Sequence, residues 1–359
     1  MEFLAEYGLF LAKTLTFVLA LAVIVSLIGA LGSKGKKKHD KGHIEVTNLN
    51  DKFKEMADSL RHAALDKLTL KQEEKTEKKK RKLEEKELKK SLKEQGGQRE
   101  KTTPVPSPKK RVFVLDFHGD IKASATENLR QEITSVLSLA TESDEVVVKV
   151  ESGGGMVHSY GLASSQLARI TDRKIPLTVC VDKVAASGGY MMACVADKIL
   201  AAPFAILGSI GVLAQVPNFN KLLKKNSIDY EMFTAGEYKR TVTMFGENTD
   251  KGRQKFKEDL EDIHVLFKEF VSEHRPQVDI AKVATGEIWF GRRATEVNLV
   301  DGLQTSDEYL LAQHPEADIY QVEFVHKKSL PEKFGFAAQG AVDRLLLTWW
   351  ERGSQNRWF

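Results

Sequence analysis

The stretch EVVVKVESGGGM, residues 145–156, indicates the class of fold. Its first half, Glu145–Val150, is a nearly continuous apolar run, which is typical of a strand buried on both faces of a sheet. Three glycines then break the strand, and Met156–Ile170 follows with helical spacing of its apolar residues. A further strand is expected at Leu177–Val181. The order strand, helix, strand predicts an α/β fold with right-handed crossovers.

Further elements are expected on both sides of this stretch. Before it, Val112–Phe117 predicts a strand and Thr126–Ala140 a helix with apolar residues on one face. After it, the uncharged run Ile199–Val216 contains proline and several glycines, so it predicts a buried strand and turn rather than a membrane span. Tyr230–Phe233 is similar to a short strand, and Thr249–His274 predicts a long amphipathic helix.

The composition excludes several classes of protein. The 359 residues carry a net charge of +4, which is too small to indicate nucleic-acid binding. Cys180 and Cys194 are too few for a disulfide-rich scaffold or a four-cysteine zinc site, and their apolar surroundings predict buried thiols. No His-Glu-x-x-His, phosphate-loop or dinucleotide motif occurs, so we expect neither a metal nor another cofactor.

Residues 1–33 predict an N-terminal membrane anchor. Thr14–Ser33 contains no charged residue and has about the 20 residues that a helix needs to cross a bilayer. A cleaved signal peptide is the alternative, but such peptides have a shorter apolar region and basic first residues, whereas Glu2 and Glu6 stand here. Lysines cluster between Lys34 and Lys41, and the positive-inside rule, taken alone, then places the bulk of the chain in the cytoplasm.

Residues 34–110 predict a charged linker that is helical or disordered. Lys71–Lys101 consists almost wholly of Lys, Glu, Gln and Arg, and it has too few apolar side chains to form a core. Val46–Leu70 has only weak helical periodicity. Three prolines between Pro104 and Pro108 then end any helix and mark the end of the linker.

A folded domain is expected at residues 111–325, beginning at about Arg111. Residues 326–359 are expected to form a C-terminal tail. Within the tail, Leu345–Trp350 predicts a helix that either touches the membrane surface or docks within an oligomer.

Ser187-Gly188-Gly189 opens an apolar helix and is the most suggestive site for chemistry. A serine at the start of a helix lies beside unpaired backbone N–H groups, and small neighbours let a substrate backbone approach. An N-cap serine with glycines for packing is the simpler explanation of this motif alone. Gly153–Gly155 lies between a strand and a helix, where its N–H groups either bind an oxyanion or only form a turn.

A nucleophilic serine needs a base to accept its proton. Lys239 is one candidate, although a solvated loop lysine is the ordinary explanation of a single lysine. A lysine base must be neutral, so the pKa of such a group has to fall from about 10.4 to roughly 7–8, chiefly through burial. Four histidines are also candidates, but none lies in a triad signature such as Gly-x-Ser-x-Gly: His118, His158, His264 and His274.

Four stretches occur in order along the chain: Val184-Ala-Ala-Ser-Gly-Gly-Tyr190, Leu207-Gly-Ser-Ile-Gly-Val212, Thr234-Ala-Gly-Glu-Tyr-Lys-Arg240 and Asn298-Leu-Val-Asp301. Each stretch is weak alone, but the ordered set is specific. Through this set the chain from about Arg111 to Asp301 resembles the signal-peptide-peptidase-type serine proteases, peptidase family S49. One departure is Gly153, which stands where the family commonly has the proline of Ser-Pro-Gly-Gly; this removes a constraint on the loop but no backbone donor.

The resemblance implies a role for five residues of this chain. Ser187 would be the nucleophile that forms an acyl-enzyme, and Lys239 would be the general base. Ser209 would hydrogen-bond the lysine. The backbone N–H groups of Gly154 and Gly188 would stabilise the oxyanion.

The resemblance also implies a ClpP/crotonase-like fold of repeated ββα units, and ring-like homo-oligomers in which adjacent protomers complete each active site. In some relatives the lysine reaches the serine of a neighbouring subunit. The expected partners are peptide or protein substrates and, through the N-terminal helix, a lipid bilayer. The expected location is the bacterial inner (plasma) membrane, with the catalytic domain on the periplasmic side. The lysines after Ser33 favour the opposite orientation.

Two other functions remain open at this point. An acyl-coenzyme A enzyme on the same crotonase-like fold would use the glycine loop as its oxyanion hole and need no Ser–Lys pair. A non-enzymatic membrane scaffold would use the charged linker and the oligomer instead. The paired motifs around Ser187 and Lys239 favour the membrane-anchored serine endopeptidase.

Overall fold

The computed structural model describes residues 7–19, 42–66, 75–76, 79, 82–83, 86 and 109–326. Two compact units divide the chain: residues Met1–His43 with His326–Phe359, and residues Ile44–Val325. In the first unit, residues 7–19 are helical.

The two membrane-related predictions largely concern residues outside the described ranges. Only residues 14–19 of the predicted span Thr14–Ser33 are among those described, and the predicted helix Leu345–Trp350 lies outside them. None of the helices in the described ranges is both long enough and apolar enough to cross a membrane.

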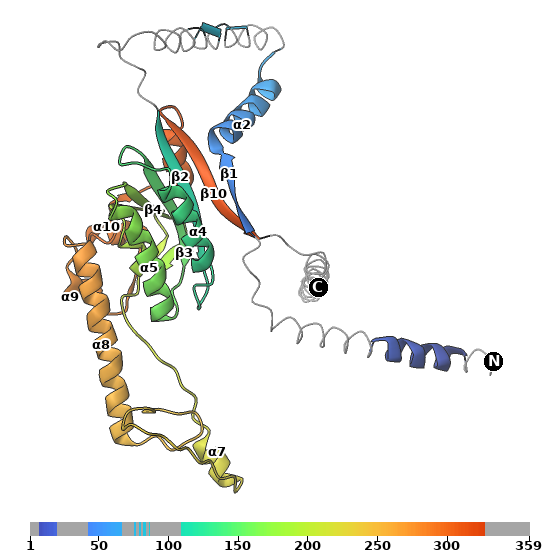
Figure 1. Ribbon diagram of the computed structural model, residues 1–359, viewed down its shortest axis with the longest axis vertical. Helices are drawn as coiled ribbons and strands as arrows, with labels where there is room; N and C mark the ends of the chain where they lie inside the picture. Colours follow the sequence, from blue (N-terminus) through green and yellow to red (C-terminus); the bar gives the residue numbers. More distant parts are fainter. Residues whose placement is uncertain are drawn as a thin grey trace, which may run out of the picture. The chain divides into compact units, whose positions relative to one another are not determined.

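The second unit is built on a mixed sheet (Figure 1). In the described part of the chain this sheet has ten strands. The main path runs β1-β10-β2-β3-β4-β6-β9, and β5, β7 and β8 continue from the end of β3. The pairs from β10 across to β9 are parallel, as are β3–β5 and β5–β7, whereas β7–β8 is antiparallel. The strands are β1 Gly42–Asn48, β2 Lys110–Gly119, β3 Glu145–Ser152, β4 Leu177–Val181, β5 Val184–Ala186, β6 Lys198–Ala201, β7 Ile206–Gly208, β8 Ile288–Phe290, β9 Gly302–Leu303 and β10 Ala317–His326.

Helices cover both faces of the sheet. Alternate residues of a strand point to opposite faces, so the apolar side chains of one strand contribute to a core on each side. From β2, Phe113 and Leu115 join a large core with α4, α5 and α6, whereas Val112 and Val114 join a smaller one with α2 and α11. Parallel strands covered on both faces explain the continuous apolar runs of the sequence. The helices are α2 Leu49–Ala64, α4 Thr126–Leu137, α5 Val157–Thr171, α6 Gly188–Ala193, α7 Asn220–Lys225, α8 Asp250–His274, α9 Ile280–Val283, α10 Gly291–Glu296 and α11 Ser306–Gln313.

The α/β class predicted from the sequence is confirmed. The expected strands and helices around the glycine loop are β2, α4, β3, α5 and β4, and the long amphipathic helix is α8. Tyr230–Phe233 is not a strand: the segment is irregular, Phe233 is 88% exposed, and no neighbouring strand offers a partner in the described sheet. Cys180 and Cys194 are buried free thiols, as expected.

The compact unit begins before the boundary expected from the sequence. It runs from Ile44, whereas the prolines predicted a start at about Arg111. Strand β1 pairs with β10, and Leu49 of α2 is buried against the smaller core. Most of β1 is exposed, and its alternation rests on only two apolar residues, Ile44 and Val46, which is too short a pattern to predict an edge strand.

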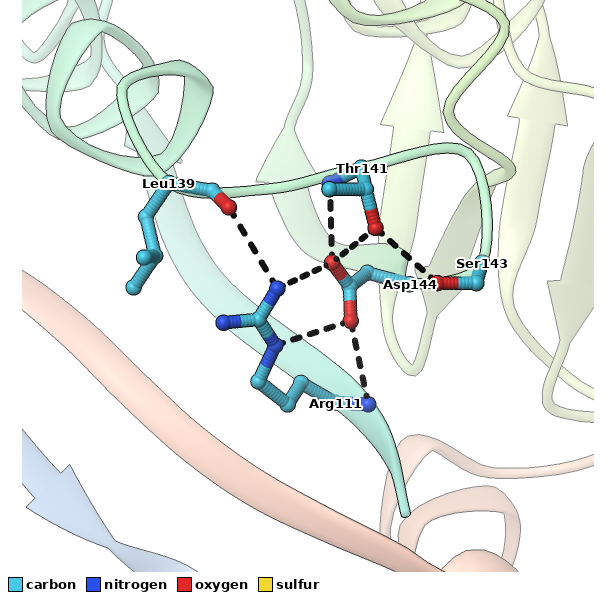
Figure 2. Close-up of polar contacts among 5 residues, drawn as sticks. All are labelled: Arg111, Leu139, Thr141, Ser143 and Asp144. Carbon is cyan, nitrogen blue, oxygen red and sulfur yellow. Dashed lines mark hydrogen bonds and ion pairs between the residues drawn. The ribbon is translucent and has the colours of Figure 1, made fainter. Parts of the chain in front are cut away.

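An ion pair fixes the start of β2 to the start of β3 (Figure 2). The Arg111 guanidinium donates to both carboxylate oxygens of Asp144, from Nε at 2.9 Å and from Nη2 at 2.6 Å. Thr141 adds hydrogen bonds from its backbone N–H and its hydroxyl. Burial alone would raise the pKa of Asp144, but these donors hold the pKa at about 2. The carboxylate is therefore charged at neutral pH and its pairing stabilises this end of the sheet.

Candidate active site

The glycine loop and the predicted nucleophile leave the sheet side by side. Ser152, the last residue of β3, pairs in parallel with Ala185 of β5. The glycine loop follows Ser152, and Ser187 follows β5 directly at the start of α6. The parallel register therefore brings Gly154 and Ser187 together, although they are far apart in sequence.

Ser187 has an unusual backbone conformation. Its φ is 52° and its ψ is −120°, outside the regions that non-glycine residues favour. The Ser187 N–H donates to the Gly208 carbonyl at 2.7 Å, which ties the residue to the end of β7. Its hydroxyl makes no capping hydrogen bond to α6, so the side chain does not act as the N-cap that the motif alone suggested. A strained, tied backbone that leaves its hydroxyl free is typical of functional sites.

Gly154 and Gly188 lie against the serine. Gly154 has a φ of +88°, and a Cβ there would lie 2.7 Å from both Ser187 Cβ and Gly188 N. Only glycine permits this approach. The Gly154 N–H donates to the Ser152 hydroxyl at 3.1 Å, inside the loop. The two residues predicted as oxyanion donors thus both adjoin Ser187.

A cavity of about 370 Å³ opens beside Ser187. Gly155, Ser187 and Gly188 are among its lining residues, and its other walls are mostly apolar side chains from α5, α6 and α8. The sequence predicted the apolar face of α8 but gave no sign that Ile263, Phe267 and Phe270 line this cavity. No histidine is among its lining residues in the described chain. An apolar pocket that has a serine among its lining residues suits a peptide side chain.

Ser209 directly follows Gly208, whose carbonyl accepts the hydrogen bond from the Ser187 N–H. It too has a positive φ, 51°, and its N–H donates to the Glu287 carbonyl at 2.7 Å. The structure thus places Ser209 near the backbone of Ser187, on a constrained turn.

Lys239 lies apart from this group. It belongs to the irregular segment between α7 and α8, its side chain is exposed, and it does not line the cavity beside Ser187. Its backbone N–H donates to the Gly236 carbonyl at 3.2 Å, within a turn. Within one chain, therefore, the structure brings together Ser187, Gly154, Gly188 and Ser209, and leaves Lys239 outside.

The last of the four matching stretches has a structural role. Asp301 pairs with the buried Arg275 through bonds of 2.7 and 2.9 Å, and its Oδ2 also accepts from the Ile199 N–H at 2.7 Å. The Leu299 carbonyl accepts from the Tyr190 hydroxyl at 2.9 Å. These contacts fix α6 and the end of α8 to the sheet, so this stretch holds the site's framework.

Comparison with known proteins shows the family of this chain. Residues 2–167 match the N-terminal part of peptidase family S49, and residues 169–319 match peptidase family S49 itself. A protein of Haemophilus influenzae described as "Probable protease SohB" is 49% identical, over 96% of each chain. The chain belongs to peptidase family S49. It is therefore a serine protease, and its two halves correspond to the two parts of the family.

Two further similarities were found for this S49 protease. A Buchnera aphidicola protein, also described as "Probable protease SohB", is 45% identical over 97% of each chain. Among solved structures, a mutant of the 1510-N membrane-bound stomatin-specific protease is 13% identical, with a TM-score of 0.38 over 57% of this chain and 85% of that one.

Proposed function

We propose that this S49 protease is a membrane-anchored serine endopeptidase in which Ser187 is the nucleophile and Lys239 the general base. The conformation of Ser187 carries the proposal, because its backbone is held at a φ of 52°, its hydroxyl makes no capping hydrogen bond, and the residue lines an apolar cavity. The substrates are peptides or membrane-derived protein fragments. Their apolar side chains suit the cavity walls.

The reaction proceeds through an acyl-enzyme. Ser187 Oγ attacks the peptide carbonyl while its proton passes to the neutral amine of Lys239. The N–H groups of Gly154 and Gly188 stabilise the tetrahedral oxyanion. The Gly154 N–H must then be shared with Ser152 Oγ, and an oxyanion is the stronger acceptor. The protonated lysine gives the proton to the leaving amine, and water then hydrolyses the ester by the same steps.

We further propose that Lys239 acts on the serine of a neighbouring copy. The segment that carries Lys239 exposes large apolar side chains, among them Phe233, 88% exposed, and Tyr238, 50% exposed. An oligomer that covers these side chains removes water from around the amine, which favours the neutral form that a base needs. Ser209, on its constrained turn beside Gly208, would then hydrogen-bond the incoming lysine.

The remaining parts of the proposal concern the fold family and the membrane. A ClpP/crotonase-like fold accords with the recurring order of two strands and a helix, as in β4-β5-α6. The apolar sequence Thr14–Ser33 supports a single-pass anchor in a bacterial inner membrane. We place the catalytic domain on the periplasmic side, because long domains translocate despite flanking lysines.

Paired variants of the full-length chain test the shared site. Ser187→Ala and Lys239→Ala are each expected to abolish cleavage of fluorescently labelled casein without unfolding the protein. When the two are co-expressed and co-purified, activity should return, because a mixed oligomer pairs an intact serine with an intact lysine. Absence of recovery would contradict action between copies. Full activity of Lys239→Ala alone would overturn the base assignment. Lys225→Ala, an exposed lysine nearby, is the matched control and should remain active.

A further inference from the structure

A chain of hydrogen bonds lies under the glycine loop. The Gly154 N–H donates to Ser152 Oγ at 3.1 Å, Ser152 Oγ lies 2.6 Å from the Tyr160 hydroxyl, and that hydroxyl donates to the Asp120 carbonyl at 2.7 Å. Ser152 is 2% exposed and Tyr160 0% exposed. The two hydroxyls in the middle of this chain are therefore shielded from water, where hydrogen bonds strengthen one another.

The direction of each proton in this chain is fixed. A phenol has one hydrogen, and that of Tyr160 points to the Asp120 carbonyl, which can only accept. The Ser152 hydroxyl must therefore donate to Tyr160, and its lone pair then faces the Gly154 N–H. The orientation of the Gly154 peptide thus depends on the Tyr160 hydroxyl, two hydrogen bonds away. Burial raises the pKa of Tyr160 above its ordinary value, so the phenol stays protonated at neutral pH.

The ring of the same tyrosine packs against the other side of the site. A Cβ on Gly188 would lie 2.4 Å from Tyr160 Cγ, so the glycine after the nucleophile rests directly on the ring. Gly119 makes room on the opposite side, because a Cβ there would lie 2.5 Å from both Ser152 Oγ and the Tyr160 hydroxyl. One side chain therefore contacts Gly188 by its ring and controls Gly154 through its hydroxyl.

We propose that Tyr160, acting through Ser152, is a positioning residue that fixes the two oxyanion donors, Gly154 and Gly188, relative to Ser187. This inference rests on the proposed function, since it concerns the oxyanion hole of that reaction. Tyr160 touches neither substrate nor reacting atoms. Its effect is to hold the glycine loop, which lacks the proline that would otherwise stiffen it, in the conformation that catalysis needs.

Tyr160→Phe in the full-length protein tests this role, because it removes the hydroxyl and keeps the ring. Three quantities are measured with a fluorogenic peptide and the aldehyde inhibitor acetyl-Leu-Leu-norleucinal: kcat, KM and the inhibition constant. We expect kcat/KM to fall by about tenfold or more. This loss is smaller than the one expected when a direct oxyanion donor is removed. KM should change less than twofold. The inhibition constant should rise by the same factor as kcat/KM falls, because the aldehyde adduct carries the same oxyanion.

The aldehyde separates positioning from mere structural damage. A variant with fewer folded molecules loses kcat but binds the aldehyde as tightly as before, and that result would overturn the proposal. Ser152→Ala should reproduce the effect, and the double variant should be no worse than Ser152→Ala, because both hydroxyls act through one chain. Additive losses would contradict the relay. Ser152→Ala also carries the test if the phenylalanine variant does not fold.

Two controls complete the experiment. Tyr309→Phe removes a hydroxyl that bonds Glu145 at 2.6 Å on the other face of the sheet, and it should leave kcat/KM and aldehyde binding unchanged. Ser187→Ala tests the proposed function itself. If Ser187→Ala remains active, the proposed function fails. If it is inactive while Tyr160→Phe retains full kcat/KM, only the positioning role fails.

Discussion

Gly154 and Ser187 approach so closely that a methyl group on the glycine would lie 2.7 Å from the serine Cβ. The approach follows from the register of two parallel strands, in which Ser152 pairs with Ala185. The loop after β3 and the turn after β5 therefore meet with no side chain between them. In the proposed reaction, this contact sets the distance between an oxyanion donor and the nucleophile.

Gly154→Ala is predicted to reduce kcat/KM by about a hundredfold, on the scale of losing one oxyanion donor. The added methyl group would overlap Ser187 and Gly188, and the φ of +88° disfavours any side chain, costing roughly 1–3 kcal/mol of folding free energy. Casein cleavage and chemical unfolding measure the two effects. Gly153→Ala is the control, since nothing lies within 4 Å of its Cβ position. Equal activity of the two variants would contradict the account.

Part of the site could be predicted from the sequence and part could not. The glycine loop and Ser187 were recognisable because local strand and helix patterns bracket them. Their contact with Tyr160 was not, because nothing in the spacing of Ser152 and Tyr160 shows that both side chains turn under the loop. The expected strand at Tyr230–Phe233 failed for a related reason: strand propensity without a pairing partner forms no sheet.

Leu266→Ser is predicted to raise KM for casein by about fivefold to tenfold with little change in kcat, because it removes apolar surface from the cavity wall. Leu266 is 58% exposed, so the fold should tolerate the change. Val265→Ser, on the same helix but outside the cavity lining, is the matched control. A raised KM in both variants would show that α8, rather than the cavity, was disturbed.

Asp144→Asn is predicted to lower the free energy of unfolding by about 2–3 kcal/mol at pH 7, because Arg111 loses its charged partner. The ordinary pKa of the carboxyl is 3.8 and its folded pKa is about 2, so its contribution is complete above 3.8 and is lost as pH falls toward 2. Urea unfolding between pH 7 and pH 2 measures this. Ser143→Ala, which removes only a hydrogen bond to Thr141, should change stability by less than about 0.5 kcal/mol.

Glu132→Gln is predicted to raise the free energy of unfolding near neutral pH, whereas Asp144→Asn lowers it. Burial raises the pKa of Glu132 from 4.5 to about 7, although its Oε1 accepts from the Phe324 N–H at 2.8 Å. The buried carboxyl is therefore most favourable when protonated, and wild-type stability should fall as pH rises from 4.5 to 7 by roughly 3 kcal/mol. Glutamine keeps the acceptor and cannot ionise. Unfolding at pH 5 and pH 8 should show the slope in the wild type and its loss in the variant. An unchanged slope would assign the pH dependence to other groups.

The most direct measurement is to map where a fluorophosphonate probe attaches to the full-length protein. Its phosphorus forms a bond to an activated serine oxygen and releases fluoride, so digestion and mass spectrometry identify the reacting residue. We predict a single adduct on the peptide that contains Ser187, absent in Ser187→Ala and slowed in Lys239→Ala. An adduct on a different serine, or labelling at full rate after Ser187→Ala, would contradict the central claim that this strained serine is the nucleophile.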